Sequence, residues 1–380
     1  MLNNKISYLA NKFQAYLFPI VKETLGEEEL LQKHYRIIQI LEIIQIERYL
    51  SLKPSGSRGR PSKHRYKVAR ALLAKHVLNL KTTAQLIHHL KVDKNLRYIC
   101  GWEPGEKVAD ESVFSRVFQL LANSNVLEKI HEALAKECFS GHCVLHNGRD
   151  AVPIPAREWP YDKNGKKMRA KKGAKKGKKK YPHRDESVSK KQAREDLPVE
   201  EMVRGLPKLC DIGKKTNSSG KVFCWRGYKL HLDVAEGWFP LSCIITSASV
   251  HDTQAAIPLS KMSSERSIVL YELMDSAYDS EAIRNYIEER DRKPLISPRI
   301  WNGRRGEETK GELRARKTLS WKPSEAKRLG HRMANERLFS RLQDHFSGMG
   351  VWVRGYDKVK CHVMLGVLCL AADELLRHLC

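Results

Sequence analysis

Long apolar runs are scarce in this sequence. No run of roughly 18 consecutive apolar residues occurs, which argues against a membrane-spanning helix. The richest run, Ile37 to Ile46, is short and contains Glu42. The first residues, MLNNKISYLANKF, lack the apolar region and cleavage site of a secretory signal peptide. We therefore expect no membrane partner.

Acidic residues are few relative to basic ones. Asp and Glu total 44 against 69 Lys and Arg, which gives a formal net charge of +25. This imbalance excludes an acidic or nearly neutral enzyme surface and favours a polyanionic partner. With the membrane set aside, nucleic acid is the partner that we expect.

Motifs for nucleotide hydrolysis and serine chemistry are absent, since no Walker loop, GxGxxG or GxSxG occurs. The nine Cys form an odd, unpatterned set, which predicts reduced thiols in the cytoplasm. Cys138, His142, Cys143 and His146 have spacings that suggest zinc. No second pair of fixed spacing follows them, and a predicted helix-to-strand boundary runs through the group, so a structural zinc site is disfavoured.

The composition that remains is that of a globular protein. Of 380 residues, 41% are hydrophobic and 30% are charged, and this length predicts two or three domains. Isoleucines at helical spacing predict a helical segment over 1–50, and several short helices are expected over 51–135. Thr82 and Asp93 are placed to cap two of these helices. A helix-turn-helix type DNA-binding domain and a plain helical packing domain fit this pattern equally well.

Two basic segments interrupt the chain. In 51–64, Arg58 and Arg60 belong to an RGRP word that resembles an AT-hook, although a basic linker explains it as well. Residues 163–194, within an insertion at 157–205, hold 12 Lys and 3 Arg against Asp185 and Glu186. So few large apolar side chains predict a mobile loop, either a solvated insertion or a clamp on phosphates. The candidate DNA contacts in it are Lys171, Lys172, Lys175 and Lys176.

An α/β pattern follows over 140–380. Strands are expected at 143–154, 267–275 and 293–299, with a hairpin over 222–249. Helices are expected at 251–259, at 280–290, around Glu336, and at 359–379, where an apolar helix would pack on the sheet. Strands first, then alternating strands and helices, predict a mixed sheet.

Three acids stand out in this region. Asp150 lies near the end of the first strand, Asp275 ends a later core strand, and Glu336 lies on a late helix. Carboxylates at strand ends can hold Mg²⁺, and two such ions about 4 Å apart can cut or join a phosphodiester. Acids in such positions are common, so the pattern alone is modest support. Asp211, in CDIGKK, is a rival first acid.

The words around these acids resemble a known family. RDAVPIPAREWP, SASVHDTQAAIPL, LYELMDSAYDS and HRMANERLFSRLQDHFSG are similar to segments of bacterial insertion-sequence transposases of the DDE class. The ordered similarity covers most of the chain, including the helical region 60–120. It implies a ribonuclease-H-like catalytic domain that follows a helical N-terminal domain.

The resemblance also implies a site. The DDE triad falls on Asp150, Asp275 and Glu336, which would hold two Mg²⁺ ions, with Mn²⁺ as a substitute. The implied partners are double-stranded DNA, as transposon ends and target, and a second copy of the chain on that DNA. The implied location is the prokaryotic cytoplasm, at the nucleoid.

The third acid of the family sits in the signature Y-x2-R-x3-E-x6-K. Arg332 and Glu336 match it, while Leu329 and Gln343 replace the Tyr and the Lys. Arg332 would contact a DNA phosphate or make a structural ion pair. The two departures keep a weakened or repurposed DNA-binding protein as an alternative, beside a metal-dependent nuclease without strand transfer.

Other residues allow two interpretations. His251-Asp252 is a recurring word of the family, but its position at a predicted helix start favours an N-cap over the active site. His362, in an apolar helix, is expected to be a core residue. Trp225 is expected to be an ordinary strand residue, with stacking on a base as the alternative.

Overall fold

The computed structural model describes residues 30–50, 65–160, 197–216, 221–298 and 322–379. The chain divides into two compact units. The helical unit comprises 1–142, 238–240 and 336–380, and the sheet unit comprises 143–237 and 241–335. Residues 336–380 thus group with the N-terminal helices, whereas the predicted α/β domain over 140–380 included them.

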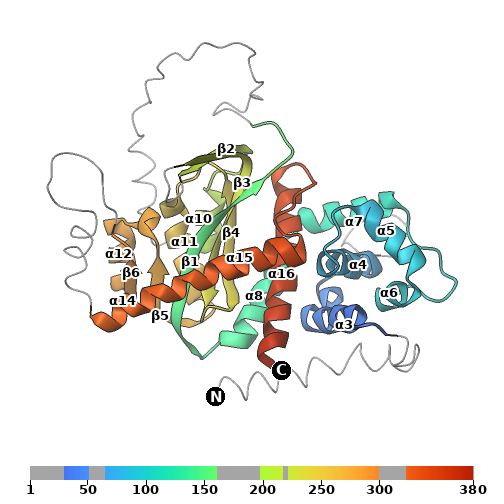
Figure 1. Ribbon diagram of the computed structural model, residues 1–380, viewed down its shortest axis with the longest axis horizontal. Coiled ribbons are helices and arrows are strands. Elements are labelled where there is room, and N and C mark those ends of the chain that lie inside the picture. The colour runs from blue at the N-terminus through green and yellow to red at the C-terminus, as the bar shows by residue number, and fades with distance from the viewer. Residues whose placement is uncertain (1–29, 51–64, 161–196, 217–220, 299–321, 380) are drawn as a thin grey trace, which may run out of the picture. The chain divides into compact units, whose positions relative to one another are not determined.

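The helical unit is built from short helices that the sequence largely predicts (Figure 1). They are α3 (Gln32–Ile44), α4 (Arg65–Val77), α5 (Thr83–Val92), α6 (Lys94–Ile99), α7 (Glu111–Ala122) and α8 (Val126–Phe139). Thr82 and Asp93 cap α5 and α6 as expected, since their side chains accept the N–H groups of Gln85 and Leu96. The isoleucines of α3 are buried in this unit.

The long C-terminal helix α16 (Tyr356–Leu379) forms the core of the helical unit. Its main neighbours are α3, α4, α7 and α8. The sequence analysis expected this helix to pack on the sheet, and that expectation stays untested, but within its own unit the helix is surrounded by other helices. A helix that is apolar all round must be covered on all sides, and here other helices supply that cover. Its Asp373 pairs with Arg36 of α3 at 2.7 Å, and Lys360 pairs with Glu128 of α8 at 2.6 Å.

Within the described residues of the sheet unit, six strands form one sheet. They are β1 (Cys143–Pro155), β2 (Asp211–Thr216), β3 (Val222–Ala235), β4 (Phe239–Ser247), β5 (Ile268–Met274) and β6 (Lys293–Ile296). The order is β2-β3-β1-β5-β6, and β4 also pairs with β3. The pairs β1–β3 and β2–β3 are antiparallel, while β1–β5 and β5–β6 are parallel. The expected mixed sheet is confirmed.

The predicted hairpin is β3–β4, and it turns at Glu236 and Gly237, which both have positive φ. Strand β2 was not predicted. Four of its six residues are Asp, Lys or Thr, so it lacks the apolar alternation of a strand. The antiparallel pairing with β3, and not its own residue pattern, holds this segment in the extended conformation.

Helices lie on both faces of the sheet. They are α10 (Val199–Arg204), α11 (Asp252–Ser264), α12 (Glu281–Glu288), α14 (Pro323–Leu329) and the start of α15 (Met333–Phe346). The helix α11 contacts β3 and β5, and α14 contacts β5 and β6. No helix in the described parts of the chain is long and apolar enough to cross a membrane. No disulfide joins the eight cysteines that the structure describes.

Candidate active site in the sheet unit

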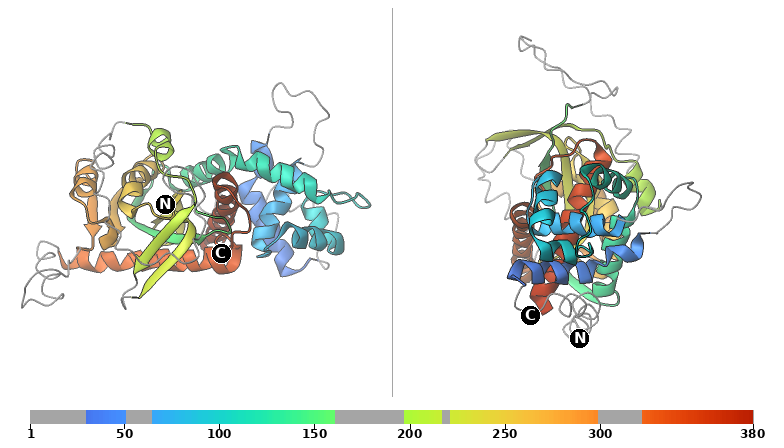
Figure 2. Two further views of the ribbon diagram at one scale, coloured as in Figure 1. Left: turned by 90° about the horizontal axis from the view of Figure 1, so that it is seen from above. Right: turned by 90° about the vertical axis from the view of Figure 1, so that its right-hand side faces the viewer.

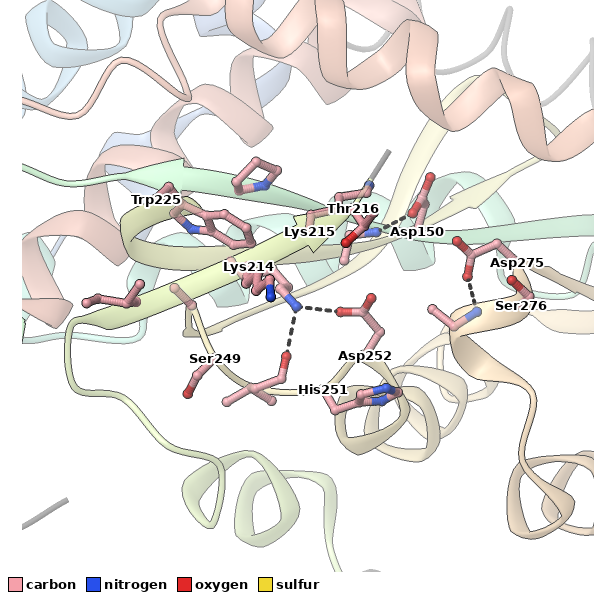
Figure 3. A pocket seen from close by; sticks show the side chains of 17 residues that line it. Asp150, Lys214, Lys215, Thr216, Trp225, Ser249, His251, Asp252, Asp275 and Ser276 are labelled. Carbon is pink, nitrogen blue, oxygen red and sulfur yellow. Dashed lines mark hydrogen bonds and ion pairs between the residues drawn. The ribbon is translucent and has the colours of Figure 1, made fainter. Parts of the chain in front are cut away.

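Two acids meet where β1 and β5 run side by side. These strands are parallel, and their last paired residues are Gly148 and Leu273. Two residues further in the same register, Asp150 lies opposite Asp275, which directly follows β5. Both side chains line one cavity of about 520 Å³ (Figure 3). The structure therefore brings together the first two acids of the expected triad.

Local hydrogen bonds fix both carboxylates. Asp275 caps the 3-10 helix Ser276–Tyr278, and its Oδ1 accepts the N–H of Ala277 at 2.9 Å. Asp150 Oδ1 accepts the N–H of Ala151 at 2.7 Å. Asp150 Oδ2 faces Nη1 of Arg332 at 3.3 Å. Each acid is thus held in one orientation by its own neighbourhood.

The negative charges of Asp150 and Asp275 repel each other, and burial makes ionisation of Asp150 still less favourable. Burial, and then the negative charge of Asp275, raise the pKa of Asp150 to about 6, although Lys215 and Arg332 act in the opposite direction. Buried carboxylates that repel each other are the donors that a hard divalent cation neutralises. The donor chemistry of the pair therefore fits such an ion. Among the described residues, no group of three or more His, Cys, Asp or Glu side chains is arranged to hold a metal.

Glu336 lies in the first turn of α15 and is exposed. It is the first residue of the C-terminal run that belongs to the helical unit, so its place beside the two aspartates stays a prediction. Gln343 is exposed on the same helix, and Leu329, the last residue of α14, is half-buried.

The segment that leads to Glu336 lies on β1. Arg328 Nη1 donates to Nε2 of His146 at 2.7 Å, and the His331 ring stacks on His146 with 4.4 Å between centroids. Further along, Arg332 reaches Asp150. Residues 146, 148 and 150 point to the same face of a strand. The chain that precedes Glu336 is therefore seated on the face of β1 that carries Asp150.

Gly148 makes this seat possible. A Cβ atom at Gly148 would lie 2.5 Å from Oδ1 of Asn335, which is fully buried. The side chains of Arg328 and His331 also crowd His146, and burial and His331 lower the pKa of His146. A glycine on this strand thus lets the following helix approach its backbone.

The opposite face of β1 carries a buried ion network. Arg149 is fully buried and donates to both oxygens of Asp233 on β3 at 2.7 Å. It also lies 3.0 Å from Glu272 on β5, which pairs with Arg292 at 2.5 Å. These contacts tie β1 to its two neighbours in one register. The sequence analysis missed them because the partners are far apart in the chain, although a charged residue beside Asp150 in a buried strand was a signal.

Further cavity residues come from β2 and from the start of α11. Lys214, Lys215 and Thr216 lie at the end of β2, while Lys229 donates to Asp252 at 2.8 Å. His251 caps α11 by accepting the N–H of Thr253, as expected, and it also lines the cavity, as does Asp252. The β2 lysines could not be identified from the sequence, since β2 itself lacks the pattern of a strand.

The other candidates have structural contacts of their own. Asp211 accepts hydrogen bonds from the N–H and hydroxyl of Ser249, and it does not line the cavity. His362 is a core residue as expected, bonded to the carbonyl of Ser347 at 2.8 Å, and burial lowers its pKa to about 3. Trp225 is a buried strand residue whose Nε1 donates to the carbonyl of Tyr228.

The suggested zinc group finds no support in the described residues, since none of them form a metal-binding cluster. The remaining candidate DNA contacts lie outside the described residues. They are Arg58, Arg60, Lys171, Lys172, Lys175 and Lys176. The same holds for the basic segment 163–194.

Comparison with known proteins supports the resemblance. A family model described as "Transposase DDE domain" matches residues 196–372, and one described as "Transposase domain (DUF772)" matches residues 22–120. No curated protein matches the chain. The first match includes Asp275 and Glu336 and begins after Asp150. Domains of this DDE class are ribonuclease-H-like, so the expected fold class, a mixed sheet with a helical N-terminal region, is confirmed.

Proposed function

The chain belongs to the insertion-sequence transposases that carry a DDE domain, and from this premise we propose that it cleaves DNA at the terminal inverted repeats of its element and transfers the freed strand. The observation that carries the proposal is the register of β1 and β5, which sets Asp150 opposite Asp275 in one cavity. The substrate is double-stranded DNA, both as transposon ends and as target.

Asp150, Asp275 and Glu336 would hold two Mg²⁺ ions, with Mn²⁺ as a substitute. When bound, such ions supply Lewis-acid stabilisation of the phosphodiester and lower the pKa of water. The raised pKa of Asp150 supports this assignment, because a cation would relieve the repulsion that raises it. Arg332 pairs with Asp150 at 3.3 Å, so it lies near enough to this acid to contact a phosphate during the reaction.

The reaction has two chemically similar steps. In the first, water attacks the phosphorus at the transposon end, and the 3′ oxygen of the transposon strand leaves as a hydroxyl. In the second, that 3′-hydroxyl attacks a phosphorus of the target strand and displaces its 3′ oxygen. Bringing two ends together requires two active sites, so we propose a homodimer on DNA. The helical unit would bind the inverted repeats, and the protein would act at the nucleoid.

The test is cleavage and strand transfer on DNA that carries the ends of the source element, with Mg²⁺. We expect Asp150→Asn, Asp275→Asn and Glu336→Gln each to lower the cleavage rate by at least about 100-fold, since each removes a charge that the transition state needs. Asp211→Asn is the matched control, because Asp211 bonds Ser249 and does not line the cavity. It should retain cleavage.

Three results would redirect the proposal. Full activity in Asp150→Asn with no activity in Asp211→Asn would identify Asp211, in place of Asp150, as the first acid of the triad. Cleavage without joined product would indicate a nuclease. Tight DNA binding with no cleavage by the wild type would indicate a repurposed DNA-binding protein, an alternative that Leu329 and Gln343 at the signature's Tyr and Lys positions keep open.

A further inference from the structure

The edge of the sheet carries an unusual ribbon. Strand β2 pairs antiparallel with residues 222–227 of β3, and the two strands lie side by side in Figure 2. Three large apolar side chains are exposed on this ribbon: Ile212 is 47% exposed, Val222 48% and Phe223 53%. In the register of the ribbon, Phe223 lies on the face of Gly213, Lys215 and Trp225, while Ile212 and Val222 lie on the other face.

Phe223 sits on a rigid support. Its ring is nearly parallel to that of Trp225, with 6.0 Å between centroids and 16° between planes. Trp225 is fixed by the hydrogen bond from Nε1 to the carbonyl of Tyr228, 2.9 Å long. Trp225 also packs over its cross-strand partner Gly213, where any Cβ atom would collide with the indole. Phe223 is therefore held as an exposed aromatic platform.

The ribbon also carries basic side chains. Lys215 lies directly opposite Phe223 on the same face, while Lys214, the preceding residue of β2, lies on the other face. Both lysines are exposed, and no ion pair links either of them to another described residue. Lys214, Lys215 and Trp225 line the same cavity as Asp150 and Asp275 (Figure 3). The cavity of the acids is thus lined by two cations and by Trp225, the ring on which Phe223 rests.

We propose that the β2–β3 ribbon binds an unpaired stretch of the DNA strand beside the acids, with a base stacked on Phe223 and phosphates on Lys214 and Lys215. This inference rests on the proposed function, since it takes DNA as the substrate. Aromatic rings beside basic residues are what proteins use to bind single strands. In a duplex the faces of the bases are covered by their neighbours, so an aromatic platform distinguishes the two forms of DNA.

The experiment measures binding by the full-length protein of two labelled probes, a 20-nucleotide oligothymidine and a 20-base-pair duplex. Salt of at least about 0.3 M suppresses contacts that depend on charge alone. Phe223→Ala should weaken binding of the oligothymidine by about 5- to 150-fold, the range for removal of one stacked base. Binding of the duplex should change less than about twofold, and Phe223→Trp should bind both probes like the wild type.

Two further variants complete the design. Lys214→Gln with Lys215→Gln should lower the salt slope for the oligothymidine by about 0.7 for each phosphate that is no longer neutralised. Lys136→Gln is the control for charge, since Lys136 already pairs with Glu132 at 2.6 Å. Trp352→Ala removes an aromatic side chain that is 47% exposed in the helical unit, and it should leave both affinities unchanged.

The outcomes separate the two proposals. Equal binding of oligothymidine by Phe223→Ala and wild type would overturn the inference, as would an equal weakening on both probes. A change from dimer to monomer in Phe223→Ala, with unchanged DNA binding, would overturn it in favour of an interface between copies. If the wild type binds neither probe and cleaves no transposon end, the proposed function itself fails.

Discussion

At the scale of single residues, the two aspartates of the site were accessible from the sequence because each stands near the end of a strand-like run. The residues that surround these aspartates could not be predicted from the sequence. Arg149 and Glu272 contribute to the site only through contacts between residues far apart in the chain. Such contacts leave no local pattern, and the same holds for the lysines of β2. The sequence thus predicted two acids that the structure brings to one cavity, while the residues around them required the structure.

The raised pKa of Asp150 has a consequence for stability. Its pKa is about 6 in the folded protein, above the value of about 4 for an exposed Asp. The folded state therefore binds this proton more tightly, and ionisation of Asp150 costs stability as the pH rises from about 4 to 6. We expect Asp150→Asn to raise the free energy of unfolding of the sheet unit by about 1–3 kcal/mol above pH 6.

This gain should shrink as the pH falls below 6, because the wild-type side chain is then protonated and neutral as well. Calorimetric melting from pH 5 to pH 8 measures it. Asp211→Asn is the comparison, since its carboxylate accepts two bonds from Ser249 and removing that charge should destabilise. A stability difference for Asp150→Asn that is constant across this range would contradict the assignment. Added Mg²⁺ at pH 7.5 should stabilise the wild type more than the variant.

At the scale of elements, the sequence predicted strands β1, β5 and β6, the β3–β4 hairpin and most helices, because each has its own periodicity or caps. It did not predict the neighbours of α16. The apolar pattern of residues 359–379 requires burial on all sides, but the pattern is the same whether a sheet or a set of helices supplies the cover. Which elements cover this helix is decided only when the whole chain folds, so the local pattern could not predict them.

Close packing of α16 gives a prediction about one glycine. A Cβ atom at Gly366 would lie 2.9 Å from the Cα of Gly348 and 3.2 Å from Cδ1 of Leu342. Replacing glycine by alanine normally stabilises a helix by up to about 1 kcal/mol. Here we expect Gly366→Ala to destabilise by about 1–3 kcal/mol, because backbone atoms must move apart.

The control for this change is Gly330→Ala, at the end of α14. Gly330 has helical backbone angles, and nothing lies within 4 Å of the position that its Cβ would take. It should be neutral or slightly stabilising. The melting temperatures of both variants test this prediction. Equal small increases in melting temperature would show that α16 and the Gly348 turn are more loosely packed than the structure indicates.

At the scale of the whole molecule, charge is the dominant feature. Residues 163–194 contribute 15 basic and two acidic residues to a chain with net charge +25. They are therefore the largest local source of attraction for DNA phosphates, and such contacts are independent of base sequence. The segment joins β1, which carries Asp150, to α10, so any DNA that it holds would be tethered to the sheet unit.

Replacing 163–194 by a Gly/Ser linker of equal length should therefore weaken binding to duplex DNA and lower the salt slope by about 0.9 for each phosphate that the linker leaves unneutralised. A scrambled segment of the same composition is the control, and it should restore both affinity and slope, because only charge is needed. Anisotropy titrations at several salt concentrations measure the slope. If the Gly/Ser chain keeps the wild-type slope, the segment is a solvated insertion, and the described surfaces, the β2 lysines among them, must supply the phosphate contacts.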